Sequence, residues 1–177
     1  MNFINDLKTK TEHIVAESTF TVSNICFSYG VSFVDLEVDV PLGRVKVNKV
    51  YAVHDSGKIL NKDLAEGQVH GGIGMAIGYA LTEQMIIDEK TGKMLNNNLL
   101  DYKIPTCLDM PEIECEFIEH YDPTGPFGNK ALGEPPLIPT APAIRNAILH
   151  ATGVGINELP MNPDRLVNEF TKAGLYN

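Results

Sequence analysis

Two stretches in the first third of the chain alternate between apolar and polar residues. In SFVDLEVDV (32–40) and RVKVNKVYAV (44–53) the apolar residues recur with a period close to two, which is typical of half-buried strands. Pro41-Leu42-Gly43 between them supplies turn residues. We therefore predict a two-stranded antiparallel unit.

Between Leu64 and Met85 the apolar residues recur every three or four positions, which predicts an amphipathic helix. Asn61 or Asp63 can cap its start. Each glycine inside such a helix costs up to about 1 kcal/mol relative to alanine. Close helix packing or close approach of a ligand must offset that cost at Gly71, Gly72, Gly74 and Gly78, four of the glycines of this segment.

The remaining elements are shorter. We predict two strands around the turn at 89–92, a strand in CEFIEHY (115–121), a helix over 143–151 and a last helix capped by Asn162. Residues 1–18 are interpreted as a lead-in, either a short helix or frayed, and residues 19–177 as one domain. Strands mixed with helices without regular alternation predict an α+β fold of antiparallel strands with a few packed helices.

Composition narrows the class of protein. The formal net charge is −9, from 23 acidic and 14 basic residues, which argues against a nucleic-acid or anionic-membrane surface. No apolar run approaches the ~20 residues of a membrane helix, and the start does not resemble a secretory signal. The three cysteines, Cys26, Cys107 and Cys115, have unrelated spacings that suit thiols in a reducing compartment. We expect a cytoplasmic protein.

The loop DPTGPFGNKALGEPPLIPTAPAIRNAI (122–148) carries the strongest candidate for chemistry. Gly133 permits close approach or an unusual backbone angle, and Pro135 favours an extended conformation of Glu134. A carboxylate held on stiff backbone suits a catalytic base. A solvated loop acid beside a rigid turn is the commoner interpretation of such a pattern, and the residues alone leave both open.

Within this loop, GPFGNKALGEPPL (125–137) resembles the glutamate loop of the molybdenum hydroxylases, the family of xanthine dehydrogenases and aldehyde oxidases. Further matches follow in the family's order: HDSGKILN (54–61), GQVHGG (67–72), DYKIPT (101–106) and PAIRNAI (142–148). The resemblance covers about residues 20 to 170. It implies that residues 19–177 form a C-terminal molybdopterin-binding domain.

The resemblance also implies roles for four residues. Glu134 is expected to be the general base when a purine or related N-heterocycle is hydroxylated with water-derived oxygen. Gln68 is expected to lie beside the molybdenum-molybdopterin cofactor, with Gly71 and Gly72 on its helical face allowing close approach. The pterin, rather than a protein side chain, is expected to hold the molybdenum. FAD and iron–sulfur clusters are expected on other chains or domains.

Three positions depart from the family's pattern. His70 stands where many relatives have glutamate, and Lys62 where proline is common. His70 can adjust the surroundings of the cofactor, although a packed or solvated histidine is the commoner case. Ala131 stands where many aldehyde-oxidising relatives carry glycine, so the loop looks closer to that of purine hydroxylases.

Two hypotheses follow for the chain as a molecule. In the first, it works only with the remainder of the molybdenum subunit and with FAD and iron–sulfur subunits, and without them leaves an apolar face through which isolated chains can form a homo-dimer. In the second, it is a structural or assembly module without cofactor, which predicts a closed polar surface and an ion pair between Glu134 and Lys130. GIGMAIG (72–78) does not have the spacing of a dinucleotide fingerprint, and neither zinc nor iron–sulfur ligand spacing occurs.

Overall fold

The fold is a three-stranded sheet with three longer helices, seen in a computed structural model that describes residues 15–19, 21 and 24–176. The predicted lead-in at 1–18 lies mostly outside the described residues. The two predicted strands are present as β1 (Tyr29–Asp39) and β2 (Arg44–Asp55), and they pair antiparallel. The turn between them closes through a hydrogen bond of 3.2 Å from the Gly43 amide to the Val40 carbonyl.

The third strand differs from its prediction in position and direction. β3 (Glu112–Phe117) begins three residues before the predicted start at 115 and pairs parallel with β2, so the sheet order is β1-β2-β3. The α+β class is confirmed, but the sheet is mixed rather than antiparallel throughout. The long connection from β2 to β3 contains the main helix, as a parallel crossover requires.

The helices are α2 (Lys62–Leu81), α3 (Thr140–Thr152) and α4 (Pro163–Lys172), with a short 3-10 turn, η1 (Pro126–Gly128). Asn61 caps α2 by accepting a hydrogen bond from the Leu64 amide. The predicted helix was too long at its end, because the Thr82 hydroxyl donates to the Gly78 and Lys103 carbonyls and the chain turns away there. Among the described residues, no helix is long and apolar enough to cross a bilayer.

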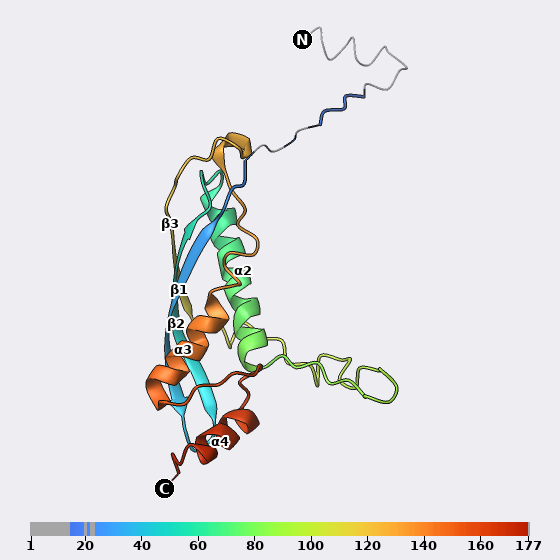
Figure 1. Cartoon of the computed structure of the whole chain (residues 1–177), viewed down its shortest axis with the longest axis vertical. Coiled ribbons are helices and arrows are strands. Elements are labelled where there is room, and N and C mark those ends of the chain that lie inside the picture. Colours follow the sequence, from blue (N-terminus) through green and yellow to red (C-terminus); the bar gives the residue numbers. More distant parts are fainter. Residues whose placement is uncertain (1–14, 20, 22–23, 177) are drawn as a thin grey trace.

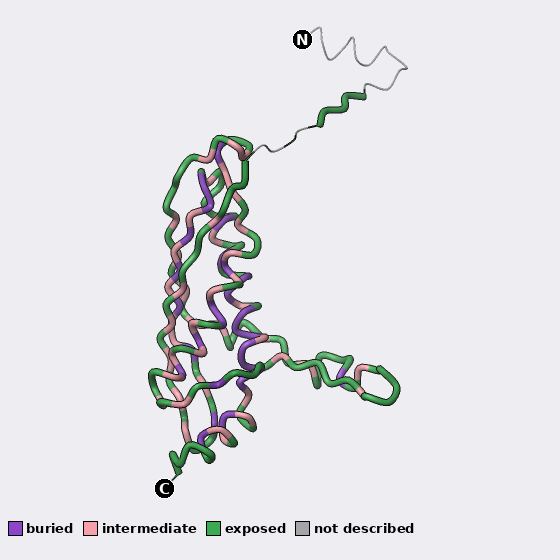
Figure 2. The backbone as a smooth tube through the Cα atoms, viewed as in Figure 1, coloured by how far each residue is buried: buried purple, intermediate pink, exposed green. Residues whose placement is uncertain are grey.

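One hydrophobic core lies between the helices and one face of the sheet (Figures 1 and 2). The residues of β1 that face the helices are half-buried, whereas the alternate residues are exposed. The fully buried centre of this core comes from four elements and contains Val50, Val69, Ile73, Ile144, Ile148 and Phe170. Within residues 24–176, the helices therefore cover one side of the sheet.

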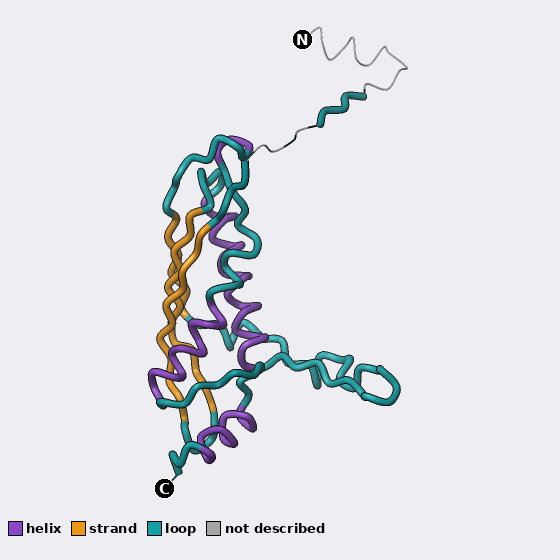
Figure 3. The backbone as a smooth tube through the Cα atoms, viewed as in Figure 1, coloured by secondary structure: helices purple, strands orange, loops and turns teal. Residues whose placement is uncertain are grey.

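The chain between α2 and β3 (82–111) forms an arm that projects from the end of α2 and then returns to the helix, where Pro105 and Met110 approach Gly78 and Gly74 (Figures 1 and 3). The two strands predicted around residues 89–92 are not formed, and a single bridge joins Ile87 to Met94. The arm extends away from the core, so no further strand packs against it, and an isolated pair of strands is marginal in water.

Candidate functional site

Glu134 lies in the loop that connects η1 to α3, immediately before a tight turn. Its carbonyl accepts hydrogen bonds from the Leu137 amide at 2.9 Å and the Ile138 amide at 3.2 Å, which fixes the backbone that carries the side chain. The side chain itself is exposed. Within the described part of the chain, no hydrogen bond or ion pair engages the carboxylate. Glu134 is thus an exposed carboxylate on a fixed backbone, which fits both the catalytic base and the solvated loop acid considered from the sequence.

The start of this loop is attached to the end of β2. The Lys58 amide donates to the Gly128 carbonyl at 2.8 Å, and the Lys130 amide donates to the Ser56 carbonyl at 2.7 Å. The Lys130 ammonium forms an ion pair of 2.9 Å with Asp55, and only 4% of the Lys130 side chain is exposed. The predicted pair between Lys130 and Glu134 is therefore wrong, because Asp55 takes the ammonium.

The Asp55–Lys130 ion pair is reflected in the pKa of Asp55. Burial would raise this pKa, but hydrogen bonds from the Lys130 ammonium and the Gly57 amide outweigh it and hold the pKa below its usual value. Lys130 also lies 5.4 Å from the centre of the Tyr29 ring. The loop is thus bound to the first two strands by charge, backbone and aromatic contacts.

Gln68 lies on the exposed side of α2 next to the glutamate loop. Its side-chain amide donates to the Gly133 carbonyl at 3.5 Å, so the residue before Glu134 lies against Gln68. A Cβ added at Gly71 or at Gly133 would meet no atom within 4 Å. The backbone is therefore open to close approach at each of these two glycines. The structure therefore brings three predicted site residues, Glu134, Gln68 and Gly71, to one exposed surface.

Gly72, the fourth predicted site residue, faces the interior. A Cβ there would lie 2.8 Å from the Cβ of Pro136, which is itself buried. The glycine lets α2 pack against the loop two residues after Glu134. The close approach at Gly72 is therefore made by this chain's own loop, and its predicted contact with a cofactor stays a prediction.

His54 and Ser56 lie on the core side of β2, below the glutamate loop. Both are fully buried, and within the described chain neither imidazole nitrogen of His54 nor the Ser56 hydroxyl has a hydrogen-bond partner. Burial lowers the pKa of His54, so the ring is held neutral. Sequence reasoning assigned no role to these residues. The sequence could have predicted their burial, because the period of two places them on the same face as Val50 and Ala52.

A shallow hollow of ≈ 270 Å³ adjoins Gln68. Ser56, Asn61, Asn129 and Lys130 line it together with the apolar side chains of Ile59, Leu60, Leu64, Ala65 and Leu132. Apolar walls with a few amide groups suit a flat heterocyclic ring, because the amides offer both donors and acceptors to the polar edge of the ring.

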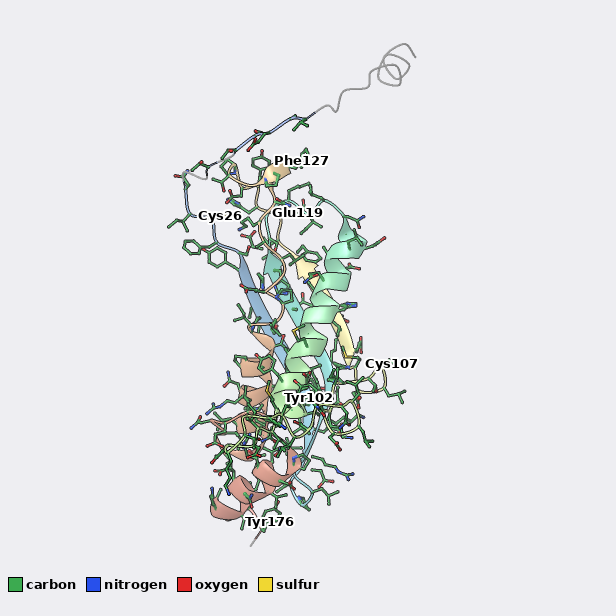
Figure 4. All side chains as sticks on the ribbon, turned by 90° about the vertical axis from the view of Figure 1, so that its right-hand side faces the viewer. Cys26, Tyr102, Cys107, Glu119, Phe127 and Tyr176 are labelled. Carbon is green, nitrogen blue, oxygen red and sulfur yellow. The ribbon has the colours of Figure 1, made fainter. Side chains whose placement is uncertain are left out.

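The end of the molecule that carries this loop is held by further polar contacts. Figure 4 shows Cys26, Glu119 and Phe127 gathered there, beyond the start of α2. Asp122 accepts hydrogen bonds from the Thr124 hydroxyl and the Cys26 thiol, which lower the pKa of Asp122 to about 2. His70 is exposed on α2. No cluster of three or more metal-ligating side chains occurs among the described residues.

The chain was compared with protein families and curated proteins. Residues 5–111 match the family described as "Molybdopterin cofactor-binding domain". The putative xanthine dehydrogenase molybdenum-binding subunit XdhA of Escherichia coli K12 is 56% identical over 160 residues, which is 90% of this chain and 21% of that protein. The aldehyde oxidoreductase molybdenum-binding subunit PaoC of the same strain is 34% identical over 139 residues, 78% of this chain and 19% of that protein.

Solved structures give the same picture. Carbon-monoxide-reduced Cu,Mo-CO dehydrogenase superposes with a TM-score of 0.80 at 28% identity, covering 89% of this chain and 20% of that one. The chain spans about a fifth of the length of the curated relatives it matches. What is matched is therefore one region of a much longer kind of subunit.

Proposed function

Because the chain belongs to the molybdopterin cofactor-binding family of molybdenum hydroxylases, we propose that it supplies the catalytic base and one wall of the cofactor site to a purine-oxidising enzyme. The observation that carries the proposal is the hydrogen bond from Gln68 to the Gly133 carbonyl, which sets an amide next to the backbone of Glu134. The remainder of the subunit, absent from this chain, completes the site.

Each proposed role follows from the chemistry of the side chain. When bound, the molybdenum-molybdopterin group supplies the oxidising centre. Glu134 is unpaired within the described chain, so its carboxylate accepts a proton from the water-derived oxygen as that oxygen is transferred to the substrate. Gln68 offers a donor and an acceptor to the pterin edge, and the open space at Gly71 admits the ring. Iron–sulfur and FAD groups on other chains or domains would accept the electrons released by the substrate.

The substrate class is the most specific part of the proposal. The chain is more similar to the xanthine dehydrogenase subunit, at 56% identity, than to the aldehyde oxidoreductase subunit, at 34%. Ala131, just before the glutamate, favours the same class on the resemblance described above. A purine or related N-heterocycle is therefore the proposed substrate.

The alternative of a structural module without cofactor receives less support. That hypothesis predicts a Glu134–Lys130 pair, and the Lys130 ammonium is bonded to Asp55 instead. It also predicts a closed polar surface, whereas five large apolar residues of β1 and its lead-in are exposed, which are Ile25, Phe27, Tyr29, Val31 and Phe33.

The test is to co-express the chain with the complementary four-fifths of the E. coli XdhA subunit and its partner subunits. Xanthine oxidation is measured together with bound molybdenum, for native Glu134, for Glu134→Gln and for the exposed arm control Glu89→Gln. A general base contributes about 10² to 10⁴ in rate, so kcat should fall by that factor in Glu134→Gln alone.

Molybdenum content should stay unchanged in Glu134→Gln, because the proposed cofactor contacts come from Gln68 and Gly71. A metal-loaded complex whose activity ignores Glu134 would contradict the proposed base. A chain that captures neither partner nor molybdenum would favour the structural module.

A further inference from the structure

The outward face of β1 begins with apolar residues. On the core side Val34, Leu36 and Val38 pack against the helices. On the other side Tyr29, Val31 and Phe33 are 64%, 44% and 61% exposed, and three acidic residues follow them along the strand. Sheets that are covered on both sides carry apolar residues on both faces, because each uncovered apolar side chain forgoes the free energy of burial.

The exposed apolar side chains of β1 continue onto β2. Val31 is paired with Val53 and Phe33 with Tyr51, and the rings of Phe33 and Tyr51 lie 6.4 Å apart. Val53 and Tyr51 are half-buried. Together these residues, with Tyr29 at one end, form a continuous surface, here called the outer sheet patch (Tyr29, Val31, Phe33, Tyr51 and Val53).

The border of the outer sheet patch is acidic. On β3 the exposed side is a row of three glutamates, Glu112, Glu114 and Glu116. Lys49 bonds the first two at 3.2 and 2.6 Å, and Glu116 raises the pKa of the Tyr51 hydroxyl beside it. In this row of three carboxylates, Lys49 thus pairs with two. A partner with a basic border complements this edge, whereas a second copy would bring the same acidic row and another formal charge of −9.

The occupant follows from size and charge together. The chain spans 21% of the XdhA subunit that it matches, so about four-fifths of a comparable subunit lies outside it. We infer that the outer sheet patch docks that remaining part of the molybdenum-binding subunit, through a segment that is apolar at its centre and basic at its border. The inference rests on the proposed function only in taking the chain as one region of a larger subunit.

Binding is measured with the 177-residue chain and the complementary part of E. coli XdhA, expressed as separate polypeptides. Phe33→Ser should weaken the complex by about tenfold or more, because large aromatic anchors carry much of the energy of an interface. Leu108→Ser is the matched control, since Leu108 is 92% exposed on the arm and lies outside the patch. Glu114→Lys should also weaken binding, and the loss should shrink as salt is raised.

A second measurement does not depend on any variant. Tyr29 and Tyr51 of the native chain are nitrated with tetranitromethane, with and without the complementary part, and quantified by mass spectrometry. Both should be protected in the complex, while Tyr176, at the opposite end of the molecule from Phe127, should react equally in both samples (Figure 4).

Three outcomes overturn the inference: unchanged nitration of Tyr29 and Tyr51 on binding, equal binding by Phe33→Ser and Leu108→Ser, or a chain dimer abolished by Phe33→Ser that excludes the complementary part. Failure of the proposed function is distinguishable. Glu134→Ala should bind like the native chain, so catalysis can fail while docking is retained.

Discussion

His54 supports both β1 and the loop that carries Glu134. A Cβ added at Gly30 would lie 2.6 Å from His54 Nδ1 and 3.2 Å from the Pro135 carbonyl oxygen, so strand, imidazole and loop meet at one point. The ring is buried without a hydrogen-bond partner in the described chain. A buried donor without a partner costs about 1–3 kcal/mol, and protonation would add a buried charge.

The stability of the chain should therefore fall in mild acid. The folded-state pKa of His54 lies below its ordinary value of 6.5, so below that pH the unfolded chain takes up a proton that the folded chain does not. The free energy of unfolding should decrease from about pH 6.5 to pH 5, and His54→Phe should flatten the decrease. Urea denaturation at several pH values measures this, with exposed His150→Gln as control. An unchanged slope in His54→Phe would contradict the assignment.

Residue-scale prediction succeeded where neighbours in sequence decide the outcome. The stiff backbone that Gly133 and Pro135 predict at Glu134 is present, since two amides bond the Glu134 carbonyl. The partner of Lys130 did not follow, because Asp55 lies 75 positions earlier and only the fold brings it within 2.9 Å. Sequence distance cannot rank a nearby glutamate against a remote aspartate.

At the scale of elements, two adjacent glycines of α2 have different surroundings and different roles. Gly71 faces open space, while Gly72 faces Pro136 at a distance that admits no methyl group. We predicted that close packing or close approach of a ligand offsets the cost of glycine in this helix. At Gly72 close packing against Pro136 does so. It also does so at Gly78, where a Cβ would lie 2.8 Å from Pro105 Cδ.

This difference gives a matched pair of substitutions. Gly67→Ala adds a methyl group to α2 where no atom lies within 4 Å, so it should stabilise the chain by up to about 1 kcal/mol. Gly72→Ala should destabilise it by about 1–3 kcal/mol, because Pro136 must move. Chemical denaturation of both variants measures the two effects. Equal stabilisation by both would show that α2 and the glutamate loop are not in contact in solution.

The elements were predicted correctly where the local residue pattern determines them. They were missed where contacts with residues remote in sequence determine their ends or direction. β1, β2 and the caps at Asn61 and Asn162 match the prediction. The end of α2 was missed, since Met85 continues the apolar period but the Thr82 hydroxyl bonds the remote Lys103 carbonyl. The direction of β3 depends on a strand more than fifty residues earlier, which no local pattern encodes.

At the scale of the whole molecule, the chain has two parts that differ in burial. The sheet and helices share one core, whereas the arm (82–111) is mostly exposed (Figure 2). Asn96 is buried and joins the two sides of the arm by bonding the Ile86 amide and the Gln84 carbonyl. At the tip, the Gly92 and Lys90 amides bond Asp88, so these contacts stay within the tip.

Limited digestion with trypsin should therefore cut at Lys90 or Lys93, at the tip of the arm, before Lys58 or Lys62 in the body. Exposed loop tips open locally at low free energy, while the end of β2 and the start of α2 open with the core. Mass spectrometry of the first fragments from the described region tests the order. Earliest cleavage at Lys58 or Lys62 would mean that the end of β2 is the weaker part.

The parallel pairing of β3 with β2 also bears on the order of folding. The β1–β2 hairpin closes through a turn of a few residues, whereas the bond from Lys49 to Glu112 closes a separation of 63 residues. The entropy lost on closing a chain segment grows with its length, so the hairpin can form early and β3 joins only after α2 has shortened the intervening chain. The three glutamates of β3 would then reach their positions beside β2 late in folding. Substitutions in β3 should accelerate unfolding more than they slow folding.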